Sequence, residues 1–233
     1  MTERMHVFSD AQGAAEGCAR AIGARLNEAI AQRGTASLAV SGGSTPKLMF
    51  REMCQIGFDW SKIHLFWVDE RVVPPDDDQS NYRMTRENLI VPGGLPENRV
   101  HRIRGEMEAV AAADLYRGAV EAILGSEPVF DVVQCGVGDD GHTASLFPGE
   151  PMVADRSGVV AALWVAKKHQ WRVTLLPKPI LAARSLYVLS SGADKANAVQ
   201  SALQGPADPL GVPSQLLRGA EWFCDAAAVQ HLA

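Results

Sequence analysis

Side chains capable of acid–base chemistry gather within residues 130–149. An apolar run there breaks at Gly136, Gly138 and Gly141, and His142 follows directly. An imidazole changes its charge near neutral pH, so it can accept a proton and later return it. Glycines allow the backbone to turn sharply and leave main-chain N–H groups uncovered. The segment therefore predicts a buried strand that ends beside a general base. A plain strand–turn–helix junction with a surface histidine is the alternative.

A second segment has the composition of an anion site. A short apolar run from Ser37 leads into Gly42 and Gly43, which Ser44 and Thr45 follow. We expect a strand, a glycine turn and a helix start, where free N–H groups, hydroxyls and the helix dipole all favour a phosphate. The spacing is not that of a P-loop. An ordinary capped turn between strand and helix is the alternative.

Charged residues lie at the ends of three further apolar runs. They are Asp69, Glu70 and Arg71 after residues 63–68, Arg172 in the run 171–176, and Lys195 after residues 186–190. The carboxyl ends of the strands in a doubly wound sheet meet at one edge, so these distant residues are expected to converge. The cations and the glycine loop would then form a phosphate pocket beside one acid–base residue.

The elements that must position these residues alternate along the chain. The expected strands, besides the run from Ser37, are residues 5–8, 63–68, 100–103, 130–138, 159–165, 171–176, 186–190 and 222–224, with segments of helical periodicity between most of them. This alternation favours an α/β fold, a Rossmann-like, doubly wound, mainly parallel sheet with helices on both faces. No linker divides the chain, so residues 1–233 are expected to form a single domain.

Local signals add further expectations. Ser9 or Asp10 is a suitable cap for a first helix and Gly34 a suitable end. Gln134 places an amide in an otherwise apolar run, which suggests the exposed end of a strand. We also expect a helix from about Ser80 to Ile90, a long helix from about Met107 to Leu124, a short helix starting near Thr143 or Ser145, and a terminal helix from Asp225.

Composition excludes several classes of protein. The 47% hydrophobic and 21% charged residues are those of an ordinary globular protein, and the net charge of −5 argues against a binder of nucleic acid or of anionic membranes. The N-terminus has no apolar signal-peptide core, and no stretch approaches the length of a membrane span. Four scattered cysteines fit free thiols in a reducing compartment, so we expect a cytoplasmic location.

No metal site is expected from the acidic run Asp76, Asp77 and Asp78. Consecutive side chains do not converge on one ion, so these carboxylates are better interpreted as solvated loop charges.

Five segments occur in an order that is familiar. They are VSGGSTP, FWVDERVVPPDDDQSNY, CGVGDDGHTASLFPG, WRVTLL and SGADK. Together they resemble the glucosamine-6-phosphate isomerase/6-phosphogluconolactonase family over nearly the whole chain. The resemblance implies a Rossmann-like enzyme that hydrolyses 6-phospho-D-glucono-1,5-lactone to 6-phosphogluconate in the oxidative pentose phosphate pathway. It implies no metal and no organic cofactor.

Residue roles follow from this resemblance together with the chemistry of a lactone. A free imidazole titrates near pH 6.5, so His142 can act as general base on water, with Asp69, Glu70 or Asp140 orienting it. The oxyanion needs donors, and backbone N–H groups of the glycine loops or Arg71 can supply them. Arg71 can contact either end of the substrate. The family resemblance implies that the phosphate is held by Gly42, Gly43, Ser44, Thr45, Arg172 and Lys195.

Two other functions stay open at this point. The related deaminase or isomerase reaction would open an amino-sugar phosphate. A non-catalytic sensor of sugar phosphates would keep the pocket without its base, whereas His142 is present. The expected partner is a small-molecule substrate, and the chain is expected to be a monomer, with a homodimer as the alternative.

Overall fold

The main sheet of the computed structural model, which describes residues 4–233, consists of six parallel strands. Their order across the sheet is β1-β9-β8-β5-β2-β3. The strands are β1 (Met5–Phe8), β2 (Ala36–Val40), β3 (Ile63–Trp67), β5 (Val132–Cys135), β8 (Ser185–Ser190) and β9 (Glu221–Asp225). This arrangement confirms the Rossmann-like, mainly parallel fold. Every residue of β2 and β5 is buried, as expected for central strands covered on both faces.

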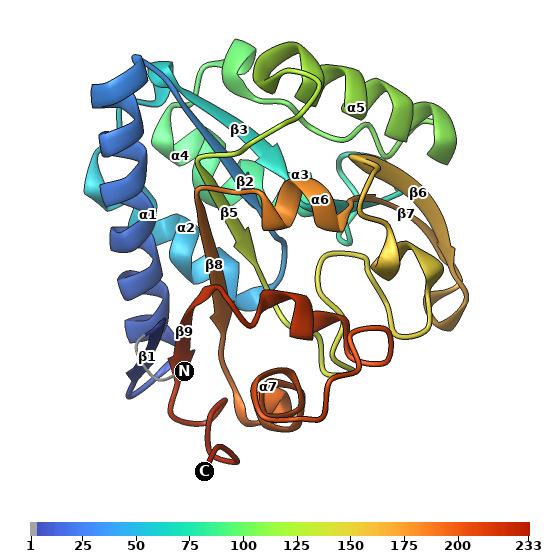
Figure 1. The fold of residues 1–233 in the computed structure, drawn as a ribbon. Coiled ribbons are helices and arrows are strands. Elements are labelled where there is room, and N and C mark those ends of the chain that lie inside the picture. The colour runs from blue at the N-terminus through green and yellow to red at the C-terminus, as the bar shows by residue number, and fades with distance from the viewer. Residues whose placement is uncertain (1–3) are drawn as a thin grey trace.

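Helices cover this sheet on both sides. Figure 1 shows α1 (Ala11–Arg33) and α2 (Ser44–Ile56) on one side, and α5 (Ala109–Leu124) and α6 (Pro177–Leu181) on the other. The Asp10 side chain accepts a hydrogen bond from the Gly13 N–H at 2.8 Å, and α1 ends at Gly34, whose φ is +78°. Both predicted ends of the first helix are therefore confirmed.

A second sheet of three antiparallel strands corrects part of the sequence-based prediction. It has the order β4-β7-β6 and consists of β4 (Asp69–Arg71), β6 (Val160–Val165) and β7 (Gln170–Leu175). Alternation alone predicted a mainly parallel arrangement throughout. The connection of residues 166–169 is too short for the crossover that parallel strands need, so β6 and β7 form a hairpin instead. In this sheet Arg71 lies directly opposite Arg172.

Several local predictions were wrong. Residues 100–103 form no strand, because only Val100 makes a single bridge to Leu65. No helix starts at Thr143 or Ser145, since Ala144 between them has a left-handed backbone with φ of +48°. Turns replace the expected helix after Asp225. By contrast, the expected helix from Ser80 is confirmed: Ser80 caps a continuous helical stretch of α3 (Asn81–Thr85), a π-helical turn η3 (Arg86–Ile90) and α4 (Val91–Gly93), which ends at Gly93 rather than near Ile90.

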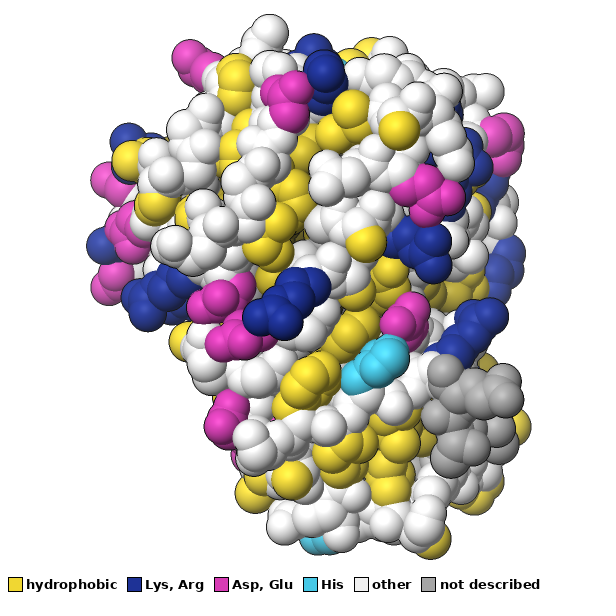
Figure 2. Space-filling view, turned by 90° about the vertical axis from the view of Figure 1, so that its left-hand side faces the viewer, with side chains coloured by type: hydrophobic (Ala, Val, Ile, Leu, Met, Phe, Trp, Pro, Cys, Tyr) yellow, Lys and Arg dark blue, Asp and Glu magenta, His cyan; other side chains and the backbone are white. Residues whose placement is uncertain are grey.

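On the face that carries α1, the described residues form no large area of one charge. Figure 2 shows basic and acidic side chains scattered among apolar ones on this side. Two of the basic residues of α1 pair within the helix, Arg20 with Glu16 and Arg25 with Glu28. Across residues 4–233, every helix is either too short or too polar to cross a membrane.

Candidate active site

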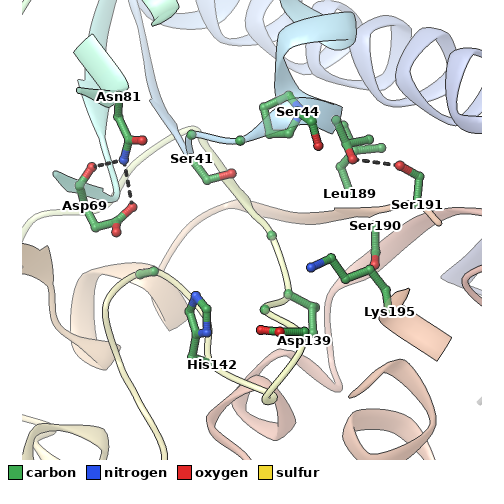
Figure 3. A pocket seen from close by; sticks show the side chains of 18 of the residues that line it. Ser41, Ser44, Asp69, Asn81, Asp139, His142, Leu189, Ser190, Ser191 and Lys195 are labelled. Atoms are coloured by element: carbon green, nitrogen blue, oxygen red, sulfur yellow. Dashed lines mark hydrogen bonds between the residues drawn. The ribbon is translucent and has the colours of Figure 1, made fainter. Parts of the chain in front are cut away.

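A cavity of about 240 Å³ lies where the loops after β2, β5 and β8 meet β4 and β7. Figure 3 shows side chains from these segments directed toward a common space. Of the residues that the sequence nominated, nine line it: Gly42, Gly43, Ser44, Thr45, Asp69, Arg71, His142, Arg172 and Lys195. Glu70 and Asp140 are not part of the lining. The predicted convergence of distant strand ends at one edge is therefore confirmed for most of the set.

His142 is held on two sides. Its Nδ1 forms a 2.5 Å hydrogen bond with Oδ1 of Asp140, which also accepts from the His142 backbone N–H. The ring stacks on Phe147, with the ring centres 4.3 Å apart and the planes at 22°. Within residues 4–233, Nε2 has no hydrogen-bond partner, and the ring projects into the cavity (Figure 3). The free Nε2 is therefore the atom that can receive a proton from a bound molecule.

Asp140 is itself fixed by a lysine on its other oxygen. Lys167 Nζ lies 2.6 Å from Oδ2 of Asp140. The hydrogen bond with His142 and then the one with Lys167 hold the pKa of Asp140 well below its usual range, although partial burial opposes this. Asp140 is therefore a carboxylate throughout the neutral range. Lys167 was missed by sequence reasoning, because nothing in the pattern KKH indicates which lysine of the hairpin tip reaches the loop.

Asp69 belongs to the cavity wall and does not contact His142. Its Oδ2 accepts from the Ser145 hydroxyl at 2.6 Å and lies 3.9 Å from Nη1 of Arg172. The amide of Asn81 donates to the Asp69 backbone carbonyl at 2.9 Å (Figure 3). Of the three acids that the sequence offered as partners of the imidazole, only Asp140 forms a hydrogen bond with it.

Glu70 fixes the backbone beside the cavity. Its two carboxylate oxygens accept from the backbone N–H groups of Arg71, Asn81 and Tyr82 and from the Ser80 hydroxyl, at 2.7–3.1 Å. Burial raises the pKa of Glu70 to about 6, against the effect of these N–H donors. This geometry does not fit the expectation that Glu70 orients His142, because both carboxylate oxygens are engaged by Arg71 and by the start of α3.

The glycine loop presents a helix start to the cavity, as predicted. Gly43 is the residue before α2, and its φ of +118° is one that side-chain-bearing residues rarely adopt. The Thr45 hydroxyl is 2.7 Å from that of Ser191, which follows β8 and which sequence reasoning did not select. Lys195 faces this end of the cavity (Figure 3) and lies 3.2 Å from Asp194. Donors and a cation thus surround one end of the space.

Gln134 positions the start of this loop from within the sheet. Its side chain is fully buried, so the expected exposed strand end was wrong. Oε1 accepts from both the backbone N–H and the hydroxyl of Ser41, at 3.1 and 3.0 Å, and Nε2 donates to the Cys135 carbonyl. A buried amide whose hydrogen bonds are satisfied in this way fixes the direction in which the chain leaves β2.

Two arginines stand side by side in the opposite wall. Arg71 and Arg172 are paired across β4 and β7, and in each the buried Nε has no hydrogen-bond partner within residues 4–233. Burial lowers the pKa of Arg172, Arg71 acts in the same direction, and Asp69 opposes the shift. Buried donors without acceptors are costly, and adjacent like charges repel. An anionic ligand in the cavity would give these donors an acceptor and would reduce the repulsion between the two guanidinium groups.

A metal ion fits this site poorly. Asp139, Asp140 and His142 bring ligand atoms within 4.8 Å of one another. However, both oxygens of Asp140 are already engaged, by His142 and by Lys167. A cation would have to displace the Lys167 ammonium group, so these residues are better suited to orienting an imidazole than to holding a metal.

Gly138 is expected to tolerate no side chain. A Cβ at this position would lie 2.0 Å from Nδ1 and Cε1 of His142, so Gly138→Ala should push the imidazole away from Asp140. Misplacement by about 1 Å can cost about 10²-fold in rate, and we expect a loss of this order in kcat for a substrate of the site.

Gly118→Ala is the matched control for this variant. An added Cβ at Gly118 meets no atom within 4 Å, and the residue lies inside α5, where alanine is favoured. The control should keep full activity and a midpoint of thermal unfolding at least as high as that of the wild type. Full activity in Gly138→Ala would contradict the placement of His142.

Comparisons with known proteins place the chain in a family. Residues 9–224 match the family described as glucosamine-6-phosphate isomerases/6-phosphogluconolactonase. A 6-phosphogluconolactonase of Rhizobium meliloti is 48% identical over 149 residues, which cover 64% of this chain and 63% of that protein. The 6-phosphogluconolactonase of Mycobacterium tuberculosis is 33% identical over 100% of this chain and 99% of its own.

A solved structure is similar over almost the whole length. The 6-phosphogluconolactonase from Trypanosoma brucei superposes with a TM-score of 0.82 at 31% identity, covering 98% of both chains.

Proposed function

The chain belongs to the glucosamine-6-phosphate isomerase/6-phosphogluconolactonase family, and from this premise we propose that it hydrolyses 6-phospho-D-glucono-1,5-lactone to 6-phospho-D-gluconate. The observation that carries the proposal is one cavity that joins an oriented imidazole to a cationic, hydroxyl-lined pocket. The imidazole suits activation of water, and the cationic pocket suits a phosphate that stays charged throughout the reaction.

His142 is the proposed general base. Nε2 takes a proton from a water molecule as the water oxygen bonds to the lactone carbonyl carbon, which gives a tetrahedral oxyanion. The bond from that carbon to the ring oxygen then breaks, and the imidazolium returns the proton to the departing oxygen. Asp140 accepts from Nδ1, which fixes the tautomer that leaves Nε2 free and stabilises the imidazolium.

We assign the oxyanion to Arg71. Among the backbone donors of the glycine turn, the N–H groups of Gly138 and Gly141 already donate to carbonyls at 2.8 and 3.0 Å. Arg71 lines the cavity, and its Nε has no partner within residues 4–233. A preorganised charged donor of this kind stabilises developing negative charge more than it stabilises a neutral carbonyl.

The phosphate is proposed to lie at the start of α2. Gly42, Gly43, Ser44 and Thr45 offer N–H groups and hydroxyls there, and the helix dipole adds favourable potential. Arg172 and Lys195 supply the charge. In this arrangement no step requires a metal or an organic cofactor. We place the reaction in the oxidative pentose phosphate pathway of the cytoplasm and propose that residues 1–233 act as a single domain.

A continuous assay of lactone hydrolysis tests the proposed function. The wild-type protein should accelerate hydrolysis of 6-phosphogluconolactone well above an enzyme-free control, which is required because lactones also hydrolyse spontaneously. The lactone that lacks the phosphate should be a much poorer substrate. Release of ammonia from glucosamine 6-phosphate without lactone turnover would instead assign the isomerase-type reaction.

Replacing Asp140 should change the pH dependence as well as the rate. The lowered pKa of Asp140 means that its carboxylate is stabilised beside His142, and by reciprocity this charge stabilises the imidazolium. Asp140→Asn removes that stabilisation of the imidazolium. The acidic limb of the kcat/KM profile should therefore move to lower pH, and kcat should fall by about 10²-fold or more because the amide no longer fixes the tautomer.

Lys167→Gln is the informative comparison for this variant. It removes the second hold on Asp140 and keeps the carboxylate, so its losses should be clearly smaller than those of Asp140→Asn. An Asp140→Asn enzyme with an unchanged pH profile and rate would show that the hydrogen bond to His142 has no catalytic role.

A further inference from the structure

A second cavity, of about 640 Å³, shares no lining residue with the first. It lies between α5, at the top of Figure 1, and the helical residues 81–93, with the segment 95–104 beside it. Tyr82 is part of its wall, whereas the preceding residue, Asn81, lines the active-site cavity. Nothing in the proposed reaction uses this space.

The charge of this cavity is opposite to that of the chain as a whole. Arg86, Arg102 and Arg104 line it together with one acid, Glu97, in a protein with a net charge of −5. Arg102 is paired with Glu106 through two hydrogen bonds of 2.6 and 2.8 Å. Arg86 and Arg104 are exposed and form no ion pair or side-chain hydrogen bond within residues 4–233. Three guanidinium groups against the single acid Glu97 in the lining, two of them without an ion-pair partner, favour an anion.

A chain of hydrogen bonds adds a neutral donor to these cations. A guanidinium group can only donate, so Arg99 donates to Nε2 of His64. His64 therefore carries its proton on Nδ1, and this N–H donates to Nε2 of His101 at 2.8 Å. Burial, and then the neighbouring His64 and Arg99, lower the pKa of His101 to about 4, so this ring is neutral at pH 7. A neutral His101 must then carry its own proton on Nδ1, which has no partner within residues 4–233.

The remaining wall is apolar. Ile90, Leu95 and Val100 contribute to it from one side, and Leu115 and Ala119 of α5 from the other. Leu115 is 46% exposed, which is high for a large apolar side chain that adjoins a cavity. The cavity therefore combines charged and hydrogen-bonding side chains with an apolar wall. Its cationic side chains and apolar wall fit a ligand that has both an anionic group and an apolar body.

We propose that this cavity is a second binding site, for an organic anion in which a phosphate, sulfonate or carboxylate group is joined to an apolar ring or chain. Arg86 and Arg104 hold the anionic group, and the apolar body lies along Leu115. The residues suitable for testing are these two arginines, because they are exposed and unpaired. Tyr82 is unsuitable, since its backbone N–H donates to Glu70 and so supports the active site.

The test uses 8-anilinonaphthalene-1-sulfonate, which combines a sulfonate with an apolar body, in a fluorescence titration of the full chain. The wild type should bind it saturably, and the double variant Arg86→Ala/Arg104→Ala should bind it at least about tenfold more weakly. The control is Arg20→Ala/Arg117→Ala, which removes the same charge from sites outside the cavity and should retain wild-type affinity. Midpoints of thermal unfolding close to the wild type establish that both double variants are folded.

Competition experiments separate this site from the active site. Neither 6-phosphogluconate nor inorganic phosphate should displace the dye, because they lack an apolar body. Equal affinity in wild type and Arg86→Ala/Arg104→Ala would overturn the proposal. Displacement by 6-phosphogluconate would also overturn it, since the dye would then occupy the active-site cavity, and displacement by inorganic phosphate would overturn the requirement for an apolar body.

Discussion

Replacing His142 with asparagine is expected to reduce kcat for lactone hydrolysis by about 10²- to 10⁴-fold, the range that a positioned general base contributes. Within residues 4–233, the His142 imidazole is the one titratable side chain that combines an oriented Nδ1, bonded to Asp140, with a ring projecting into the cavity. Asparagine can keep a polar contact with Asp140 but cannot accept a proton from water. The measurement is the initial rate of 6-phosphogluconolactone hydrolysis, corrected for the enzyme-free rate.

Binding and folding should survive this substitution. KM for the phosphorylated lactone is expected to change much less than kcat, because the phosphate end of the cavity is made by other residues. The matched control is His169→Asn, at an exposed hairpin position whose left-handed backbone asparagine tolerates. Wild-type turnover in His142→Asn, with the control also active, would remove His142 from the mechanism.

Replacing Arg172 with alanine should instead act mainly on substrate binding. A hydrogen bond to a charged group contributes about 1.5–3 kcal/mol, which corresponds to an increase in KM of about 10- to 150-fold for the loss of one such contact. The guanidinium group lines the cavity, is largely buried and has an unpartnered Nε, so the substrate phosphate is its expected acceptor. Steady-state kinetics with 6-phosphogluconolactone measure this change.

Two comparisons make the result specific to the phosphate. Arg172→Lys keeps the charge but loses the planar pair of donors, so its KM should lie between those of the wild type and the alanine variant. Glucono-1,5-lactone, which lacks the phosphate, should be hydrolysed by Arg172→Ala as poorly as it is by the wild type. A large loss of activity toward that unphosphorylated lactone would show that Arg172 acts on the reacting carbonyl or on the neighbouring Asp69, rather than on the phosphate.

Local patterns were sufficient for the parts of the fold that depend on short stretches of chain. The alternation of apolar runs with helical periodicity predicted the parallel sheet, and Asp10 and Gly34 marked the ends of α1. Local patterns failed where an apolar run can pair with more than one other strand. The apolar pattern of residues 159–165 and 171–176 fits strands of the main sheet as well as strands of a separate hairpin. The feature that excludes a crossover is the short connection between β6 and β7.

By itself the sequence determined the kind of site and most of its members. Residues that follow parallel strands converge at the edge where the carboxyl ends of those strands meet. The sequence shows a histidine after a glycine turn, a glycine-hydroxyl loop before a helix, and cations at strand ends. His142, Thr45 and Lys195 could therefore be placed together in advance.

The tertiary structure alone decided which acid serves the imidazole. Asp69, Glu70 and Asp140 are chemically alike, and their roles differ only in what the folded chain places around each carboxylate. Ser145 and Asn81 hold Asp69, the start of α3 holds Glu70, and only Asp140 meets the imidazole. Such contacts depend on loop paths fixed by long-range packing, as when the β6–β7 hairpin brings Lys167 across to Asp140. No local propensity encodes them.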